Sequence, residues 1–249
     1  MLRDRVSKFT ERKVKEHFTW ASGEYATRKG YVHPEHDPII LNFIKDTCTE
    51  DSKILEVWGG SGYMLDLIAS ETDIKHLYNC EIVSEVYKKQ VNKDINLIGG
   101  NALNLPFKSN SFDYVIIKNL LHHLVGRTRR ESKDNARRAV KELKRVTKDG
   151  GYIIILDQYN RHEFFSSIIF YLTLFFSIFG ISFKSFGLGK NVIVSFLTPD
   201  GIRKFLTRAG DVEIVFDREN RLDVSKKLKY TLLMSDIGRL LIIGKVKIK

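Results

Sequence analysis

The segment 54–68 (ILEVWGGSGYMLDLI) passes from a short apolar run through a glycine-rich turn directly into a helical pattern. Residues 53–57 are typical of a buried strand, and residues 64–70 of the helix that follows it. Glycine at such a turn lets the backbone approach a ligand, and a helix N-terminus offers unpaired N–H donors. By itself, this pattern predicts only a tight connection between a strand and a helix.

The same alternation continues along the chain. Further strands are predicted at 75–80, 96–99, 114–118, 152–156, 211–216 and 239–244, and helices at 84–92, 134–146 and 202–209. Asp149-Gly-Gly is expected to separate the helix at 134–146 from the strand at 152–156. Because helices separate the strands, we expect an α/β, doubly wound, mostly parallel sheet of seven strands. The last two strands lack a clear helix between them, which allows one of them to run antiparallel.

Composition narrows the class of protein further. The 249 residues are 43% hydrophobic and 29% charged, a balance that suits one globular domain. Cys48 and Cys80 fit neither a disulfide framework nor a zinc site, so we expect two reduced thiols and no metal. The first residues lack the apolar core of a secretory signal, which favours a cytoplasmic location.

The formal net charge is +11, and residues 127–148 hold ten basic and three acidic side chains. A basic surface favours anionic partners such as nucleic acid, acidic lipid head groups or phosphorylated molecules. A merely solvated surface explains the same charge equally well.

Polar and acidic residues recur just after the predicted strands. Glu81 follows the second strand, at the place where a carboxylate binds two ribose hydroxyls in related sheets. Asn101-Ala102 follows the third strand, and Asp113 precedes a fourth strand that runs into Lys118-Asn119-Leu-Leu-His122-His123. In this order and spacing the blocks resemble class I S-adenosylmethionine-dependent methyltransferases, over the region from about residue 14 to the end. The branch with the greatest similarity methylates small molecules and lipids and includes quinone- and sterol-biosynthesis enzymes.

The resemblance implies a Rossmann-like methyltransferase fold with S-adenosylmethionine as cofactor. It implies cap helices at 1–48, a cofactor-binding half at 50–160, an apolar insert or cap at 161–197 after the fifth strand, and a closing helix and strands at 198–249. It further implies that Glu56 lies near the methionine amino group, Glu81 at the ribose hydroxyls and Lys118 near the transferred methyl group. The other implied cofactor-binding residues are Trp58, Gly60, Gly62, Ile82, Asn101, Ala102, Asn119 and Tyr25.

Two residues depart from the family pattern. Trp58 stands where the first turn usually has glycine, so its indole must point away from the cofactor or crowd it. Asn101 stands where aspartate is usual, and its amide carbonyl still accepts a hydrogen bond but carries no charge. These departures leave open a non-catalytic relative.

Methyl transfer from a sulfonium depends mainly on in-line positioning, so a dedicated base is optional for a reactive nucleophile. A carbon or hydroxyl nucleophile would need one, and histidine or a carboxylate suits that role. The catalytic residues are therefore unknown from the sequence, with His33, His123 and Asp157 as weak candidates, and His36 and His122 in segments that could also face the pocket.

The segment 164–181 has 18 residues without a charge, which is the length of a membrane span. A single crossing would separate the last two strands from their sheet, so we expect no simple span. The segment is instead a cap over an apolar pocket, a homodimer face, or an interfacial helix through which 161–190 contacts an anionic membrane.

The pattern therefore favours methyl transfer to a small, apolar or lipid-like acceptor by a cytoplasmic protein, with peripheral membrane contact as an option. The first alternative is a tRNA or rRNA methyltransferase, suggested by the charge, although nucleic acid is the less favoured partner. The second is a methyltransferase-like binding protein whose Trp58 has closed the pocket. A nicotinamide dehydrogenase is the least favoured, because the turn lacks the Gly-x-Gly-x-x-Gly register.

Overall fold

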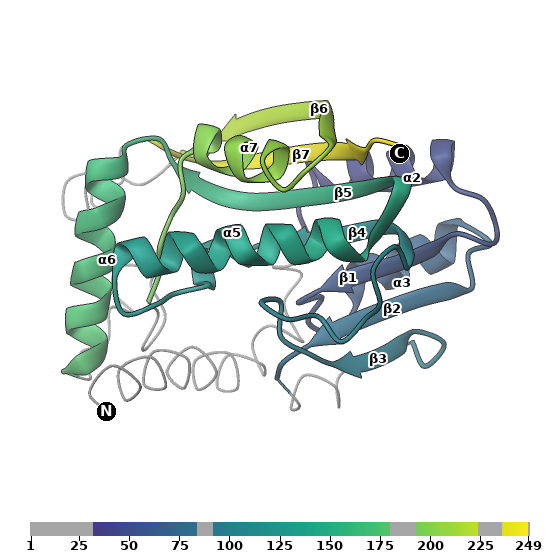
Figure 1. The fold of residues 1–249 in the computed structure, drawn as a ribbon, viewed down its shortest axis with the longest axis horizontal. Coiled ribbons are helices and arrows are strands. Elements are labelled where there is room, and N and C mark those ends of the chain that lie inside the picture. Colours follow the sequence, from purple (N-terminus) through teal and green to yellow (C-terminus); the bar gives the residue numbers. More distant parts are fainter. Residues whose placement is uncertain (1–31, 84–91, 180–192, 224–235, 249) are drawn as a thin grey trace.

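The computed structural model describes residues 32–83, 92–179, 193–223 and 236–248. They form a seven-stranded sheet in the order β3-β2-β1-β4-β5-β7-β6 (Figure 1). The strands are β1 (Lys53–Val57), β2 (His76–Glu81), β3 (Asn96–Gly99), β4 (Phe112–Lys118), β5 (Thr147–Asn160), β6 (Val212–Arg221) and β7 (Ile237–Val246). The helices are α2 (Asp37–Thr47), α3 (Tyr63–Glu71), α5 (Arg129–Val146), α6 (Glu163–Ile178) and α7 (Pro199–Thr207), with a short 3-10 turn at Leu121–His123.

The sheet is mostly parallel, as the alternation of strands and helices predicts. Strands β1 to β5 pair in parallel, whereas β7 is antiparallel to both β5 and β6. The prediction that one closing strand reverses is therefore confirmed, and the strand is β7. The strand order changes direction between β1 and β4, so the carboxyl ends of these two strands mark the place where such sheets bind ligands.

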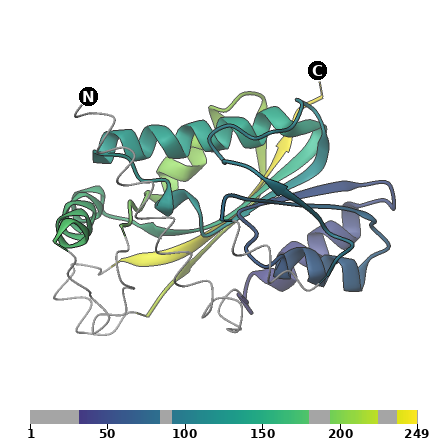
Figure 2. The ribbon, with the colours of Figure 1, turned by 90° about the horizontal axis from the view of Figure 1, so that it is seen from below.

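Helices cover both faces of the sheet (Figure 2). On one face α5 and α7 pack through a core that includes Ala136, Leu143 and Leu206. On the other face α2 and α3 pack through a core that includes Ile44 and Leu65. Within a strand the side chains alternate between these two cores, so strand position tells which face a polar side chain occupies.

Three predicted boundaries were wrong by five residues: the starts of α5 and β5, and the end of β6, which lies at Arg221 and not at 216. Helix α5 begins at Arg129 and not at 134, because Thr128 caps it by accepting a hydrogen bond from the Glu131 backbone N–H at 3.1 Å. The fifth strand begins at Thr147, before the predicted glycine stop. Residues 148–151 bulge out of the pairing with β4, and Gly150 has a φ of 78°. Glycine adopts the conformation of the bulge without strain, so the strand continues through it.

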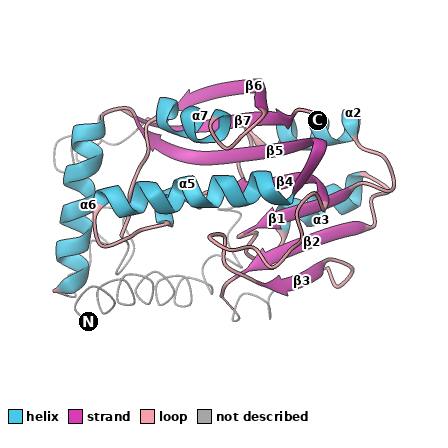
Figure 3. Ribbon diagram, in the orientation of Figure 1, coloured by secondary structure: helices cyan, strands magenta, loops and turns pink. Residues whose placement is uncertain are grey.

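Helix α6 is the apolar insert. It lies beyond one end of the strands and runs roughly perpendicular to α5 (Figure 3). It covers Glu163–Ile178, and the predicted continuation beyond 179 lies outside the described residues. Among the described helices, none is both long enough and apolar enough to span a bilayer. Four side chains near one face of α6 are at least half exposed: Phe164, Tyr171, Phe175 and Ile178.

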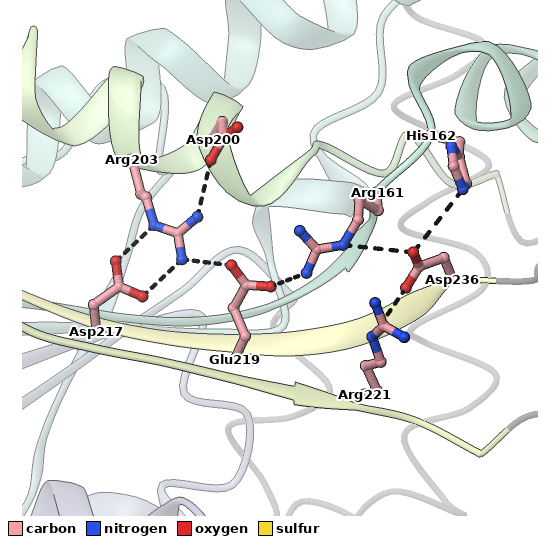
Figure 4. A network of polar contacts seen from close by, with 8 residues as sticks. All are labelled: Arg161, His162, Asp200, Arg203, Asp217, Glu219, Arg221 and Asp236. Carbon is pink, nitrogen blue, oxygen red and sulfur yellow. Dashed lines mark hydrogen bonds and ion pairs between the residues drawn. The ribbon is translucent and has the colours of Figure 1, made fainter.

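The face of β6 toward α7 carries an ion-pair network that fixes the closing strands (Figure 4). Arg203 of α7 contacts Asp217 at 2.6 Å and Glu219 at 2.6 Å, and Arg161 also pairs with Glu219. The acidic partners of Arg203 raise the pKa of its guanidinium. The charged residues on the face of β6 toward α7 are thus paired with oppositely charged neighbours.

Candidate functional site

The turn between β1 and α3 has a backbone conformation that favours glycine. Residues Trp58, Gly60 and Gly62 have φ values of 65°, 59° and 80°. A Cβ at Gly59 would lie 2.7 Å from the Glu56 carboxylate, so this position requires glycine for lack of space. Gly60 and Gly62 were predicted at this turn, whereas Gly59 was not singled out. The turn therefore brings backbone close to Glu56 at the carboxyl end of β1.

Trp58 adopts the left-handed conformation that the family's glycine would adopt without strain. Its backbone N–H donates to the Cys80 carbonyl at 2.7 Å. The half-buried indole packs against two apolar clusters, one of them formed by Val83, Val125, Phe170 and Ile193. The ring thus contributes to packing, which accounts for a tryptophan at a position with unfavourable backbone geometry.

Replacing Trp58 separates the strain from the packing. We expect Trp58→Ala to lower the free energy of unfolding by about 3 kcal/mol, through lost burial of the indole and a retained positive φ. Trp58→Gly loses the same burial but removes the strain, so it should be about 1 kcal/mol more stable than Trp58→Ala. Urea denaturation of both variants measures this difference, and equal stabilities would contradict a strained turn.

Glu81 ends β2 and holds the neighbouring backbone. Its carboxylate accepts hydrogen bonds from the N–H groups of Ile82 at 2.8 Å, Val83 at 3.0 Å and Gly60 at 3.3 Å. Burial raises the pKa of this carboxyl to about 7, against the opposing effect of those hydrogen bonds. Glu81 and the glycine turn are therefore adjacent, as the sequence predicted, and Ile82 lies half-buried beside them.

Glu56, Lys118 and Asp37 form a buried charged group between β1, β4 and the start of α2. Lys118 Nζ lies 2.6 Å from Asp37 Oδ1, and both side chains are at least nine-tenths buried. Asp37 Oδ2 also accepts a hydrogen bond from the His33 N–H at 2.7 Å. Burial raises the pKa of Glu56 to about 7, and its Oε2 atom has no hydrogen-bond partner. A buried carboxylate oxygen in this state is ready to accept a cationic donor.

Asn119 follows Lys118 in the left-handed conformation, with a φ of 52°. Its side-chain nitrogen lies 2.8 Å from His33 Nε2. Burial, and next the charge of Lys118, lower the pKa of His33 to about 4. His33 is therefore neutral at physiological pH and is a weak base, better suited to positioning Asn119 than to accepting a substrate proton.

Asn101 and Ala102 occupy the loop after β3, beside Glu81. The Gly100 N–H donates to the Glu81 carbonyl at 3.1 Å, which places the loop at the end of β2. Asn101 Oδ1 accepts from the Leu103 N–H at 2.9 Å, and Ala102 is buried in the core. The Asn101 carbonyl, which was expected to accept a hydrogen bond in the cofactor site, therefore already closes a local turn.

His122 and Asp157 are in direct contact between the end of β4 and β5. Asp157 Oδ1 lies against His122 Nδ1, and Asp157 Oδ2 accepts from the Leu121 N–H at 2.5 Å. The His122 ring stacks on Phe196 at 5.5 Å between centroids. A carboxylate only accepts hydrogen bonds, so Nδ1 carries the proton and Nε2 is left as the acceptor when the ring is neutral. Of the two neighbouring histidines, His122 is therefore the one that Asp157 holds in place.

Three comparisons with known proteins bear on this arrangement. The family described as "Methyltransferase domain" matches residues 55–155, which run from β1 through most of β5. Residues 55–155 therefore form a methyltransferase domain of the S-adenosylmethionine-dependent kind. A solved SAM-dependent methyltransferase from Methanosarcina mazei superposes with a TM-score of 0.57 at 20% identity, covering 83% of this chain and 98% of that one. At this identity the superposition supports the fold alone.

Two curated relatives are similar to part of the chain. The demethylmenaquinone methyltransferase of Staphylococcus haemolyticus is 33% identical over 116 residues, covering 43% of each chain. The tRNA (carboxymethyluridine(34)-5-O)-methyltransferase of Arabidopsis thaliana is 29% identical over 140 residues, covering 51% of this chain and 32% of its own. The chain thus spans less than half of the length of either relative.

S-adenosylmethionine is the cofactor of this family, and the residues present fit it. Its ammonium group suits the unpartnered Glu56 oxygen, and its ribose hydroxyls suit the Glu81 carboxylate at the end of β2. Because glycine has no side chain, the turn leaves space beside its backbone between Glu56 and Glu81. Tyr25, the remaining cofactor-binding prediction, lies outside the described residues.

Asp37 is the functional residue that the sequence did not reveal. It precedes Pro38 at the first turn of α2, where an acidic residue is common for helix capping and dipole reasons alone. Nothing local indicates that it pairs with Lys118, because the two residues are 81 positions apart in the chain. Only the packing of α2 against β4 brings them together.

Proposed function

We propose that this chain transfers a methyl group from S-adenosylmethionine to a small organic acceptor. The observation that carries the proposal is the buried Glu56 carboxylate at the glycine turn, with one oxygen lacking a partner. When bound, the cofactor would supply a sulfonium methyl group, whose carbon bonds to the acceptor as the bond to sulfur breaks in line and S-adenosylhomocysteine leaves. Glu56 would bind the ammonium group, Glu81 the ribose hydroxyls, and Lys118 and Asn119 would line the wall beside the transferred methyl.

Among the candidate bases for the acceptor's proton, the hydrogen bonds favour His122. Asp157 orients its ring through Nδ1 and leaves Nε2 to accept a proton from a hydroxyl or carbon acid. His33 has a pKa of about 4 and a partner in Asn119, so it is the weaker choice. His123, half-buried and beside His122 with 4.0 Å between ring centroids, would border the same space.

The similarity to the demethylmenaquinone methyltransferase of Staphylococcus haemolyticus supports an apolar or lipid-like acceptor. The exposed aromatic side chains of α6 are consistent with such an acceptor, with a peripheral membrane contact or with a homodimer face. The membrane and homodimer hypotheses stay predictions, and nothing in the proposed chemistry depends on them.

The pH dependence of cofactor binding tests the proposal. The pKa of Glu56 is about 7 before the ligand binds, and an ammonium ligand favours the ionised carboxylate. Affinity should therefore rise about tenfold from pH 6 to pH 8, with proton release on binding. The stability of the fold depends on pH in the opposite direction. Because the pKa of Glu56 is raised in the folded protein, this carboxyl contributes stability that is fully present below about pH 4.5 and is lost as the pH rises through about 7.

Isothermal titration with S-adenosylmethionine in two buffers of different ionisation heat measures both the affinity and the released proton. In the Glu56→Gln variant we expect weaker binding at pH 8 and a shallower pH dependence, with the remaining slope due to Glu81. Absence of binding by the unaltered protein at high micromolar cofactor would refute the proposal.

RNA methylation is the second candidate, supported by the tRNA methyltransferase relative and by the exposed arginines of α5. Transfer of labelled methyl groups distinguishes the two. Incorporation into total RNA that falls steeply with salt would favour the RNA acceptor, because phosphate contacts are salt-dependent. Incorporation into a solvent extract of small molecules, independent of salt, would favour the small acceptor.

A further inference from the structure

A row of polar side chains crosses five strands on the sheet face that carries α2. Glu56 of β1 and Lys118 of β4 begin the row, and Gln158 of β5 continues it two residues beyond Leu156, the partner of Lys118. Gln158 pairs in register with Arg239 of β7, and Arg239 with Asn220 of β6. We call Glu56, Lys118, Gln158, Arg239 and Asn220 the polar row.

The segment 33–37 covers the polar row through side-chain contacts. Asp37 pairs with Lys118 at 2.6 Å, and His33 contacts Asn119 at 2.8 Å. At the far end, Asn220 Nδ2 donates to the Glu35 carboxylate at 2.9 Å. The row is therefore continuous with the cofactor residues at one end and enclosed by the start of α2.

Buried polar atoms without hydrogen-bond partners concentrate here. Both ring nitrogens of His36 lack a partner, although the residue is only 1% exposed. Asn160 Nδ2, Arg239 Nε and Asn220 Oδ1 lack one as well. More than nine-tenths of buried polar groups in proteins are hydrogen-bonded. Several exceptions side by side indicate that something polar, a ligand or ordered water, completes this region.

The charges of the region indicate which ligand. Arg239 is half-buried and has no ion pair within 4.0 Å among the described residues. Of the nearby acids, Asp37 is paired with Lys118, whereas Glu35 keeps its negative charge because its hydrogen-bond partner Asn220 is neutral. Burial lowers the pKa of Arg239 in spite of both acids, so the charge of its guanidinium is only partly compensated. The far end of the row therefore combines this guanidinium with buried hydrogen-bonding groups that lack partners among the described residues.

We propose that the far end of the polar row binds an oxyanion of the methyl acceptor, with Arg239 as the charged partner and His36 beside it. The proposal rests on the proposed methyl transfer and deepens it by naming the acceptor class: a small molecule that carries a carboxylate or a phosphate. The guanidinium presents a planar fork of donors that matches either group. Two strand spacings separate β4 from β7, so the anionic group lies about 10 Å from the strand that bears Lys118.

Nuclear magnetic resonance of the Arg239 Nε–H group tests this on the full chain. The signal is identified by its loss in Arg239→Gln, and inorganic phosphate and acetate are titrated separately into protein saturated with S-adenosylhomocysteine. We expect a saturable shift with a millimolar dissociation constant for at least one anion, and the stronger of the two identifies the acceptor's group. In Arg239→Gln the anion affinity measured by calorimetry should fall at least about tenfold, while S-adenosylhomocysteine binding stays unchanged.

Arg203 provides the matched control, because its guanidinium is ion-paired with Asp217 and Glu219 on the opposite face. Its Nε–H should not respond, and Arg203→Gln should keep the anion affinity. Equal shifts at both arginines, or none at Arg239 up to about 100 mM anion, would show general ionic effects or water-filled space and overturn the proposal. An anion-induced shift of Arg239 that occurs in the protein without S-adenosylhomocysteine and is lost in the saturated protein would assign Arg239 to the cofactor instead. Failure of S-adenosylhomocysteine itself to bind would count against the methyl transfer and not against the anion site.

Discussion

Lys118→Met is expected to lower the free energy of unfolding by about 3 kcal/mol or more. The substitution leaves the Asp37 carboxylate buried with only the His33 N–H as partner, and loss of one member of a buried ion pair typically costs 3–5 kcal/mol. It also removes the positive charge that lowers the pKa of Glu56, so that carboxyl should hold its proton to higher pH. Urea denaturation followed by circular dichroism at pH 7 measures the stability.

Two further variants make this test specific. Asp37→Asn combined with Lys118→Met removes both charges and should be more stable than Lys118→Met alone, because no unpaired charge stays buried. Lys45→Met breaks a pair with Glu71 whose side chains are 40% and 46% exposed, and it should change stability by less than about 0.5 kcal/mol. If Lys118→Met were as mild as Lys45→Met, the buried pair would not be an element of the folded protein.

Glu81→Ala is expected to weaken S-adenosylmethionine binding about a hundredfold, or about 2.7 kcal/mol. Its carboxylate would hold the ribose hydroxyls and also fixes the Gly60, Ile82 and Val83 N–H groups that border the cofactor. Hydrogen bonds to a charged group contribute about 1.5–3 kcal/mol each, so loss of the group accounts for an effect of this size. Isothermal titration with the cofactor and with S-adenosylhomocysteine measures the change.

Glu81→Gln is the matched control, since it keeps an accepting oxygen and the side-chain volume. We expect a smaller loss of affinity, about tenfold. The pKa of about 7 means that ionising buried Glu81 costs stability above neutral pH, so Glu81→Gln should unfold at higher urea than the unaltered protein at pH 8. Unchanged cofactor affinity in both variants would remove Glu81 from the site.

Much of the fold was predictable because its signals are local. Apolar periodicity located every described strand, with errors of up to five residues at the ends, and the lack of a predicted helix between the last two strands allowed a reversed strand. The errors lie where tertiary contacts override local cues. The fifth strand passes through Asp149-Gly-Gly because β4 pairs with it on both sides of the bulge and β7 pairs with it after the bulge.

The candidate site was predictable in part. Glu56, Gly60 and Glu81 were expected to meet, and they do, since the carboxyl ends of neighbouring parallel strands share one edge of the sheet. The expected role of Asn101 was incomplete, because a hydrogen bond to Leu103 two residues away competes for its carbonyl. The resemblance to the family flagged Trp58 as unusual, but could not say where the indole packs.

The sequence by itself determined the order of the elements, the glycine turn and the identity of the carboxylates after β1 and β2. These depend on periodicity, turn residues and adjacency along the chain, which are local properties. The tertiary structure alone decided that Asp37 neutralises Lys118, that Asp157 holds His122, and that Arg239 lies beside His36 with no ion pair to any of the described residues. The physical reason is that each of these depends on strand register and on which face a side chain occupies, and both follow from the packing of segments far apart in the chain.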